Sequence, residues 1–214
     1  MNTHRRFVPK VSPIPPGPSP AGIDRRVART QQALTMALVE LVLAKRYAAI
    51  TVRDLLDRAD VGRSTFYAHY RSKDDLLLTS FVHMLDRLDA GLDRDGAGGR
   101  VAPVAELFQH VGEVTAFHRA LVRAKVIERL FQAGTVRMSG HIERRLAALA
   151  GGSYGNGKAA GAATAELPVR VAAQAHAGAL FALLRWWIDQ GAPHTPAEMD
   201  AMFHALVRGG RHGA

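Results

Sequence analysis

The side chains best suited to chemistry in this 214-residue chain cluster around Arg63. Apolar spacing turns Phe66 and Tyr70 toward a core and leaves Arg63, Ser64 and Tyr67 facing outward. The guanidinium fork of Arg63 can bond O6 and N7 of guanine, and the Ser64 hydroxyl can bond a base edge or a phosphate. Arg63 and Ser64 are therefore the candidate base-reading residues.

Catalytic chemistry has little support in the sequence. Ten histidines are present, but there is no His-Glu-x-x-His pair, and His141-x-Glu143 lacks the downstream cysteines that a zinc deaminase needs. The absence of cysteine also excludes disulfides, thiolate metal sites and cysteine nucleophiles. We therefore expect no catalytic residue, no metal and no cofactor, and a helical enzyme is the less favoured alternative.

The charge of the chain favours a polyanionic partner. There are 28 Lys and Arg against 19 Asp and Glu, and residues 1–75 contain 13 of these basic residues but only 7 of the acidic ones. A localised basic region binds phosphates favourably because it releases their condensed counterions. A simple contribution to solubility is the other explanation.

The N-terminal segment differs from the rest of the chain. Six prolines lie between residues 9 and 20, where they remove amide donors and disfavour helix. We expect residues 1–22 to form a disordered basic arm. No apolar h-region of a secretory signal follows Arg5 and Arg6, and no apolar run reaches the roughly 18 residues of a membrane span. We expect a cytoplasmic location and no membrane partner.

Apolar residues three and four positions apart predict an all-α fold after the arm. A serine or threonine with an acid three residues later marks helix starts at Thr51, Ser72 and Thr195. Gly134 is expected to separate two helices, and residues 151–166 are expected to form a mobile glycine- and alanine-rich loop. The nine predicted helices cover residues 24–45, 51–59, 63–69, 72–93, 101–115, 117–132, 135–149, 168–190 and 195–208.

Two short helices joined by a tight turn indicate a helix-turn-helix, in which the second helix enters the major groove. Periodicity alone does not distinguish this motif from an ordinary helical hairpin. Residues 51–77, Thr-Val-Arg-Asp-Leu-Leu-Asp-Arg-Ala-Asp-Val-Gly-Arg-Ser-Thr-Phe-Tyr-Ala-His-Tyr-Arg-Ser-Lys-Asp-Asp-Leu-Leu, resemble the N-terminal domain of TetR-type regulators. The resemblance extends over about residues 25–80, and its most specific part is Thr-Phe-Tyr-x-His-Tyr-x-x-Lys at residues 65–73.

The resemblance implies a nine-helix TetR-like architecture, with a helix-turn-helix domain at residues 23–72 and a ligand-binding and dimerisation domain at residues 73–214. It implies a homodimeric repressor that a small-molecule effector releases from an inverted-repeat DNA operator; a non-specific DNA-binding protein is the alternative. It also assigns phosphate-backbone contacts to Thr51, Thr65, Tyr67, His69 and Lys73. Three basic residues at the start of the first helix are also placed to meet phosphates: Arg25, Arg26 and Arg29.

Two residues depart from the family pattern at the turn. Asp60 stands where the family usually has glycine, and aspartate tolerates left-handed backbone better than most residues. Gly62 can cap the next helix but supplies no side-chain oxygen. We expect the turn to survive both changes.

The C-terminal region offers candidates for two further sites. Aromatic and polar residues could bind a moderately apolar effector, although each could also be core or surface: Phe108, His110, Phe117, His118, Arg123, Gln132 and His141. Small and apolar residues on the last two helices could pair two subunits in a four-helix bundle, with intrachain packing as the alternative: Val171, Ala175, Gly178, Ala182, Trp186, Met199, Met202, Phe203 and Leu206.

Overall fold

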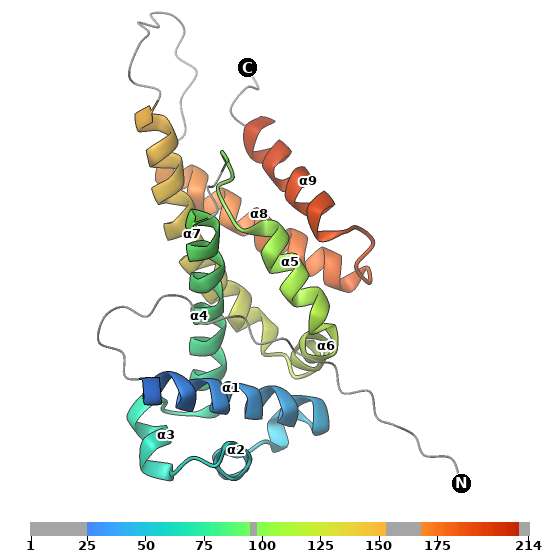
Figure 1. Ribbon diagram of the computed structural model, residues 1–214. Coiled ribbons are helices and arrows are strands. Elements are labelled where there is room, and N and C mark those ends of the chain that lie inside the picture. Colours follow the sequence, from blue (N-terminus) through green and yellow to red (C-terminus); the bar gives the residue numbers. More distant parts are fainter. Residues whose placement is uncertain (1–24, 95–97, 153–167, 210–214) are drawn as a thin grey trace, which may run out of the picture.

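The computed structural model describes residues 25–94, 98–152 and 168–209, and every regular element in these ranges is helical. The predicted all-α fold is confirmed for this part of the chain, including its nine α-helices (Figure 1). The helices are α1 (Arg25–Ala44), α2 (Val52–Ala59), α3 (Arg63–His69), α4 (Lys73–Arg94), α5 (Val104–Glu113), α6 (Thr115–Arg123), α7 (Ile127–Gly152), α8 (Val169–Asp189) and α9 (Pro196–Gly209), with a 3-10 turn, η1 (Tyr47–Ala49), between α1 and α2. The predicted arm at residues 1–22 lies outside the described residues, as does the predicted loop at residues 151–166 except for its first two residues, which belong to α7.

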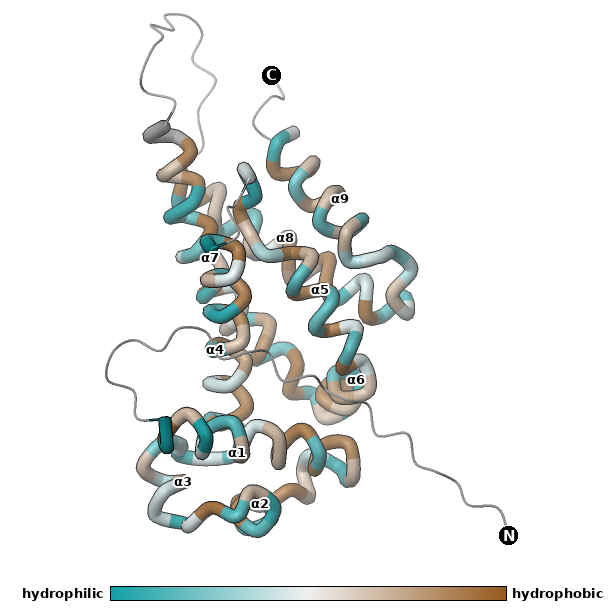
Figure 2. The backbone as a smooth tube through the Cα atoms, in the orientation of Figure 1, coloured by the Kyte–Doolittle hydropathy of each residue, from teal (hydrophilic) through white to brown (hydrophobic). Residues whose placement is uncertain are grey.

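Helices α1, α2 and α3 gather at one end of the molecule, and α4 leads from them into the larger helical region (Figure 1). Within that region α7 packs along both α4 and α8, and α5 packs against α9. Apolar segments of these helices face one another in the interior (Figure 2). Helix α1 contacts both α4 and α6, so these two helices connect the three-helix unit to the rest of the described chain.

The predicted helix caps at Thr51 and Thr195 are confirmed. The Thr51 hydroxyl accepts the amide of Asp54 at 3.2 Å, and the Asp54 carboxylate accepts the amide of Thr51 at 2.7 Å. Thr195 and Glu198 form the same reciprocal pair at the start of α9. The hydroxyl of Ser72 caps the start of α4. These bonds satisfy amides that the first helical turn leaves without partners.

The expected helix break at Gly134 is wrong. The break lies between α6 and α7, where Lys125 adopts a left-handed backbone with φ of 58°, and α7 runs through Gly134 without interruption. A Cβ at residue 134 would lie 2.3 Å from Cζ of Phe181 on α8. Glycine is needed here because a helix must approach an aromatic ring closely, not because the chain must turn.

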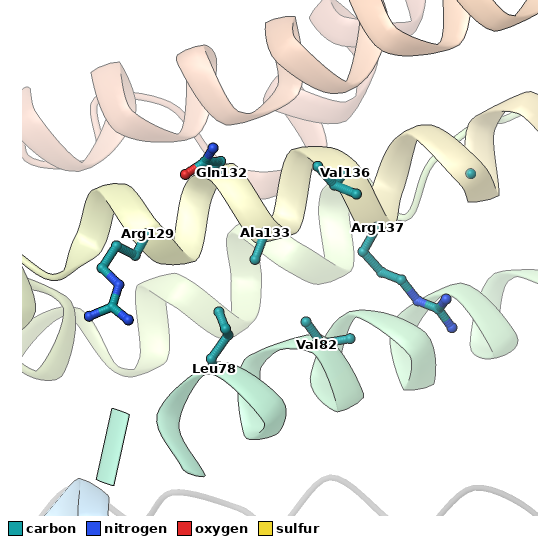
Figure 3. Close-up of a pocket in the computed structure, with 8 residues that line it drawn as sticks. Leu78, Val82, Arg129, Gln132, Ala133, Val136 and Arg137 are labelled. Carbon is teal, nitrogen blue, oxygen red and sulfur yellow. The ribbon is translucent and has the colours of Figure 1, made fainter. Parts of the chain in front are cut away.

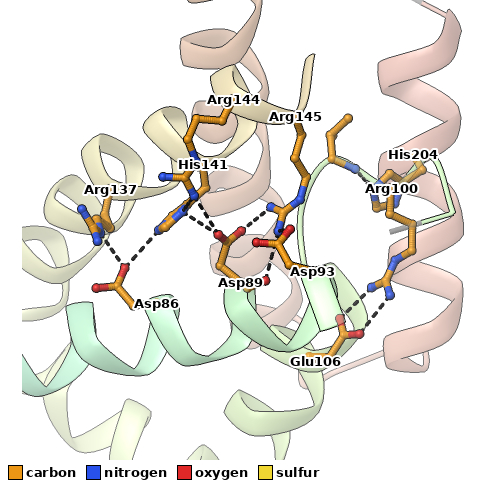
Figure 4. A network of polar contacts seen from close by, with 11 residues as sticks. Asp86, Asp89, Asp93, Arg100, Glu106, Arg137, His141, Arg144, Arg145 and His204 are labelled. Atoms are coloured by element: carbon orange, nitrogen blue, oxygen red, sulfur yellow. Dashed lines mark hydrogen bonds and ion pairs between the residues drawn. The ribbon is translucent and has the colours of Figure 1, made fainter. Parts of the chain in front are cut away.

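Charged residues join α4 to α7 along their contact (Figure 4). Buried Asp89 pairs with Nδ1 of His141 at 2.6 Å and also accepts a hydrogen bond from Arg145. Asp86, closer to the start of α4, accepts from Nε of Arg137 at 2.5 Å and from Nε2 of His141 at 3.0 Å. Burial disfavours the charge of Asp89, but hydrogen bonds from His141 and Arg145 hold its pKa below the usual value. We call these contacts the α4–α7 ion cluster. They form only when α4 and α7 keep one alignment along their axes.

A second polar network holds the segment before α5 against α9 (Figure 4). Arg100 donates to both carboxylate oxygens of Glu106 at 2.9 and 2.6 Å, and to Asp200 at 2.7 Å. The amide of Val101 donates to Nε2 of buried His204 at 3.1 Å. Because Nε2 of His204 accepts this hydrogen bond, the single ring proton of the neutral imidazole belongs on Nδ1. Nδ1 lies 2.9 Å from the Asp200 carbonyl oxygen. Burial lowers the pKa of His204, which favours this neutral form.

We expect Gly134→Ala to destabilise the chain, because the new methyl group overlaps the buried ring of Phe181. The free energy of unfolding should fall by about 1–3 kcal/mol in urea titrations. Gly140→Ala on the same helix is the matched control: no atom lies within 4 Å of its added Cβ, so it should stabilise by about 0.5–1 kcal/mol. A stabilised Gly134→Ala variant would contradict this account of the α7–α8 contact.

We expect the chain to lose stability in mild acid, because buried His118 is held as the neutral imidazole. Burial lowers its pKa from 6.5 to about 4, so the unfolded chain takes up a proton where the folded chain does not. The stabilising contribution is complete above the unfolded pKa and declines as the pH falls toward 4. Urea titrations should show about 2 kcal/mol less stability near pH 5 than near pH 7.5 from this residue.

The same titrations on His118→Gln should give a smaller loss between these pH values, since glutamine does not titrate. If His118→Gln lost as much stability as the wild type, burial of a neutral His118 would not be the cause.

Candidate nucleic-acid interface

Helix α3 presents one face to the core and the other to solvent. Phe66 and Tyr70 are buried, whereas Arg63, Ser64 and Tyr67 are exposed, as the sequence predicts. The Arg63 guanidinium lies 5.5 Å from the centre of the Tyr67 ring, and that ring meets Phe66 edge to face at 5.3 Å. The buried Phe66 ring therefore contacts the Tyr67 ring, and the Tyr67 ring in turn positions the Arg63 guanidinium at the start of the exposed face.

The turn between α2 and α3 fixes the angle at which that face is presented. Asp60 has φ of 52° and ψ of 48°, so the prediction that aspartate would accept left-handed backbone here is confirmed. Gly62 caps α3 with φ of −67° and makes no side-chain bond, as expected. Leu55 is buried beneath the turn, and the partly buried Val61 packs against the same core. The two helices thus form the helix-turn-helix expected from the sequence.

Lys73 binds the chain itself. Its ammonium donates to the carbonyl oxygens of Tyr47 at 2.8 Å and Ile50 at 2.7 Å, and it lies 4.7 Å from the centre of the Tyr47 ring. Two of its three N–H groups are therefore engaged between α4 and the segment that precedes α2. The phosphate contact implied by the resemblance stays a prediction, and the contacts give Lys73 a positioning role.

Tyr47 extends this connection to α7. Its hydroxyl donates to Oδ1 of Asp74 at 2.5 Å, and Oδ2 of Asp74 accepts from Arg129 at 3.2 Å. Burial, followed by the hydrogen bond to Asp74, raises the pKa of Tyr47 well above its usual range. The 3-10 turn next to the helix-turn-helix is thereby joined to α4 and α7.

The remaining residues that are predicted to contact phosphates differ in solvent exposure and in the hydrogen bonds that they make. Thr65 and His69 are exposed. The Thr51 hydroxyl donates to Asp54 at 2.7 Å within the cap, so its hydrogen is engaged in this arrangement. Lys45, followed by Thr51, holds the pKa of Asp54 well below its usual range. The basic residues at the start of α1 are exposed: Arg25, Arg26 and Arg29. Each phosphate assignment stays a prediction.

The candidates that the sequence suggests leave out exposed cations of the helix-turn-helix region, among them Arg53 and Arg71. The Arg53 side chain is 90% exposed on α2, with Asp57 at 3.7 Å, and Arg71 is exposed just after α3. Their place within the motif, outside its apolar positions, is a signal that the sequence already contains. Both belong with the candidate phosphate contacts.

The candidate effector residues lie in different surroundings in the structure. Phe108 is buried against the Trp187 ring at 5.2 Å, and His118 is also buried. His141 belongs to the α4–α7 ion cluster, and its contact with an effector stays a prediction. Arg123 is exposed, and Gln132 lines a surface groove between α4 and α7. His110 and Phe117 are partly buried.

The candidate dimer residues divide by exposure. Met199 and Phe203 are 1% and 0% exposed, so assigning them to a dimer interface is wrong: they pack in the core of their own chain. Gly178 is partly buried. The others are exposed on α8 and α9, and their pairing stays a prediction: Val171, Ala175, Ala182, Trp186, Met202 and Leu206.

Comparison with known sequences identifies the helix-turn-helix. Residues 35–79 match the family model described as "Bacterial regulatory proteins, tetR family". The uncharacterized HTH-type transcriptional regulator YxbF of Bacillus subtilis (strain 168) is 45% identical over 71 residues, which are 31% of this chain and 19% of that protein. EthR, an HTH-type transcriptional regulator of Mycolicibacterium smegmatis, is 34% identical over 74 residues, 35% of this chain and 32% of EthR. The chain thus spans about a fifth and a third of these relatives.

Solved structures extend the similarity of fold to most of the chain. The dihydroxyacetone kinase operon activator DhaS has a TM-score of 0.60 at 16% identity and covers 83% of this chain and 93% of its own. A TetR transcriptional regulator from Streptococcus agalactiae 2603V has a TM-score of 0.52 at 22% identity and covers 86% and 96%. At these identities the likeness establishes the TetR-like fold.

Neither a membrane-spanning helix nor a metal site is found among the described residues. No helix in residues 25–94, 98–152 or 168–209 is both long and apolar enough to cross a membrane. In the same ranges, no group of three or more His, Asp or Glu side chains could hold a metal ion.

We expect Lys73→Met to destabilise the helix-turn-helix region, because it leaves the carbonyl oxygens of Tyr47 and Ile50 without their charged donor. Urea unfolding should show a loss of about 1.5–3 kcal/mol. Arg71→Met is the matched control, since it removes one exposed positive charge two residues away and should cost less than about 0.5 kcal/mol. Equal losses in the two variants would contradict the positioning role.

Proposed function

We propose that the chain is a sequence-specific DNA-binding transcriptional regulator of the tetR family, because its helix-turn-helix matches the model of that family over residues 35–79. The observation that carries the proposal is the exposed face of α3, where Arg63 leads a helix whose opposite face is buried. Arginine at the start of a recognition helix can bond guanine in the major groove. A regulator of bacterial DNA works in the cytoplasm, so that location is part of the proposal.

Non-specific DNA binding and catalysis are the two alternative functions, and one experiment distinguishes them from sequence-specific regulation. A non-specific DNA-binding protein uses the same positive charge but reads no base, and an enzyme needs no DNA. Footprinting the DNA upstream of the chain's own gene, with shuffled DNA of the same composition as control, separates them. A discrete protected site upstream and none on shuffled DNA is the expected result. Equal protection of both, or protection of neither, would refute sequence-specific regulation.

We further propose that the regulator is a homodimeric repressor released by a small-molecule effector. Exposed apolar side chains on α8 and α9 support pairing, since Leu206 is 57% and Met202 is 46% exposed. Two such helices from each subunit can close a four-helix bundle. A two-fold dimer then binds an inverted repeat with half-sites about one helical turn apart. The effector would change DNA affinity by favouring a different spacing of the two α3 helices.

We expect the chain to be a dimer without DNA, and Leu206→Glu to produce monomers, because a buried glutamate lacks a partner in an apolar interface. Light scattering at micromolar concentration measures both masses. Leu43→Glu, at an exposed apolar position on α1, is the control and should remain dimeric. A monomeric wild type would refute the dimer, and a dimeric Leu206→Glu would move the interface elsewhere.

We expect Arg63→Ala to weaken binding to the best DNA site by about 1–3 kcal/mol and to relax base preference at one position per half-site. Arg29→Ala should instead weaken binding to all sequences similarly and lower the slope of log affinity against log salt by about 1 for each phosphate contact that it removes. Fluorescence anisotropy on matched and substituted sites distinguishes the two effects. The reverse pattern would show that α3 does not face the major groove as proposed.

A further inference from the structure

A surface groove of about 570 Å³ runs between α4 and α7 (Figure 3). Its volume lies within the range of small-molecule sites in proteins. It differs from the interior site expected from the sequence, since only Gln132 of the seven candidate effector residues lines it. The lining residues are Leu78, Val82, Arg129, Gln132, Ala133, Val136, Arg137 and Gly140.

Most of the residues that line the groove are apolar. Leu78 and Val82 of α4 face Ala133 of α7 across it (Figure 3), and Val136 is 67% exposed at its edge. No atom lies within 4 Å of a Cβ added to Gly140, so glycine leaves open space at this end. Such a surface gains free energy when a hydrocarbon body covers it.

Two guanidinium groups add positive charge to this apolar surface. Arg129 and Arg137 are eight residues apart on α7, so their Cα atoms are separated by about 12 Å along the helix. Arg129 uses Nη1 on Asp74, and Arg137 uses Nε on Asp86. A guanidinium has more N–H donors than these bonds use, so each can also bind a carboxylate.

The Arg129 end of the groove is connected to the helix-turn-helix. The carboxylate of Asp74 that accepts from Arg129 also accepts from the Tyr47 hydroxyl, and the Tyr47 carbonyl oxygen accepts from Lys73. A hollow of about 20 Å³ is lined by Tyr47, Asp74 and Arg129 and shares Leu78 with the groove. A ligand that drew Arg129 away from Asp74 would therefore alter the contacts that hold the turn before α2.

We propose that the groove binds an amphipathic monocarboxylate, with its carboxylate on Arg129 and its hydrocarbon body over Leu78, Val82 and Val136. The complementary charge comes from a guanidinium whose donors are only partly used, and the apolar floor selects a hydrocarbon body over a small hydrophilic anion. A carboxylate on the spare N–H groups of Arg129 draws the guanidinium toward the groove, so binding weakens the Arg129–Asp74 bond that supports the 3-10 turn and lowers DNA affinity. This last step rests on the proposed function.

The groove itself is tested without DNA. Isothermal titration of the full chain with decanoate should show binding, and decanol, which has the same chain length without the charge, should bind at least about tenfold more weakly. Gly140→Leu should fill the groove and weaken decanoate binding at least about tenfold, with its folding checked by thermal melting. Ala148→Leu adds similar bulk at an exposed position of α7 outside the groove and should bind as the wild type does. Equal affinity for decanoate and decanol, or unchanged binding by Gly140→Leu, overturns the site.

The coupling is tested on the DNA site found by footprinting. Decanoate should weaken DNA binding by a factor that DNA imposes equally on decanoate binding. Arg129→Gln should reduce both decanoate affinity and this factor, while Arg119→Gln, at an exposed arginine on α6, should reduce neither. Decanoate binding without any effect on DNA affinity overturns the coupling. A chain that binds no DNA refutes the proposed function and the coupling together, and the titration without DNA still decides the groove.

Discussion

The ammonium of Lys73 is the contact on which the placement of the helix-turn-helix depends. It stands at the first residue of α4 and binds two carbonyl oxygens on either side of the turn that precedes α2. A neutral side chain of the same length leaves both oxygens without a charged donor, in a place that is partly shielded from water. One hydrogen-bonded cation therefore holds the turn before α2 against α4, and the buried residues Leu55 and Phe66 pack α2 and α3 into the same core.

Helix α4 links this contact to the rest of the chain through charge as well as apolar packing. Its carboxylates at residues 74, 86, 89 and 93 each pair with an arginine of α7. Burying charged groups costs free energy that pairing only partly recovers, so these pairs are better understood as fixing the register of two helices than as a source of stability. A displacement of α7 would break several pairs at once, and the outermost of them reaches the turn before α2.

Local features of the fold could be predicted from sequence, whereas long-range ones could not. The caps at Thr51 and Thr195 and the left-handed Asp60 depend on residues within four positions, so their spacing predicts them. Gly134 has the composition of a helix breaker, but its environment is set by Phe181, 47 residues away. No local pattern shows that a ring will lie against that glycine.

The candidate sites show the same difference between local features, which the sequence predicts, and long-range ones, which it does not. The exposed face of α3 follows from the helical period and is predicted correctly. The partners of His141 are Asp86 and Asp89 on a different helix, so the sequence alone does not show that this histidine belongs to an ion cluster. Met199 and Phe203 have the types expected of an interface, but α5 and α9 pack together and bury them. The α4–α7 groove arises only where two helices meet, so its residues give no signal along the sequence.

We propose that the outward face of α3 reads DNA sequence from a two-fold dimer. Selection of bound fragments from a random DNA pool, followed by sequencing, tests this proposal on many sequences at once. The expected result is enrichment of one inverted repeat, with half-sites about one helical turn or a multiple of it apart. Recovery of DNA with no enriched motif would contradict the claim, since the chain would then bind phosphates without reading bases.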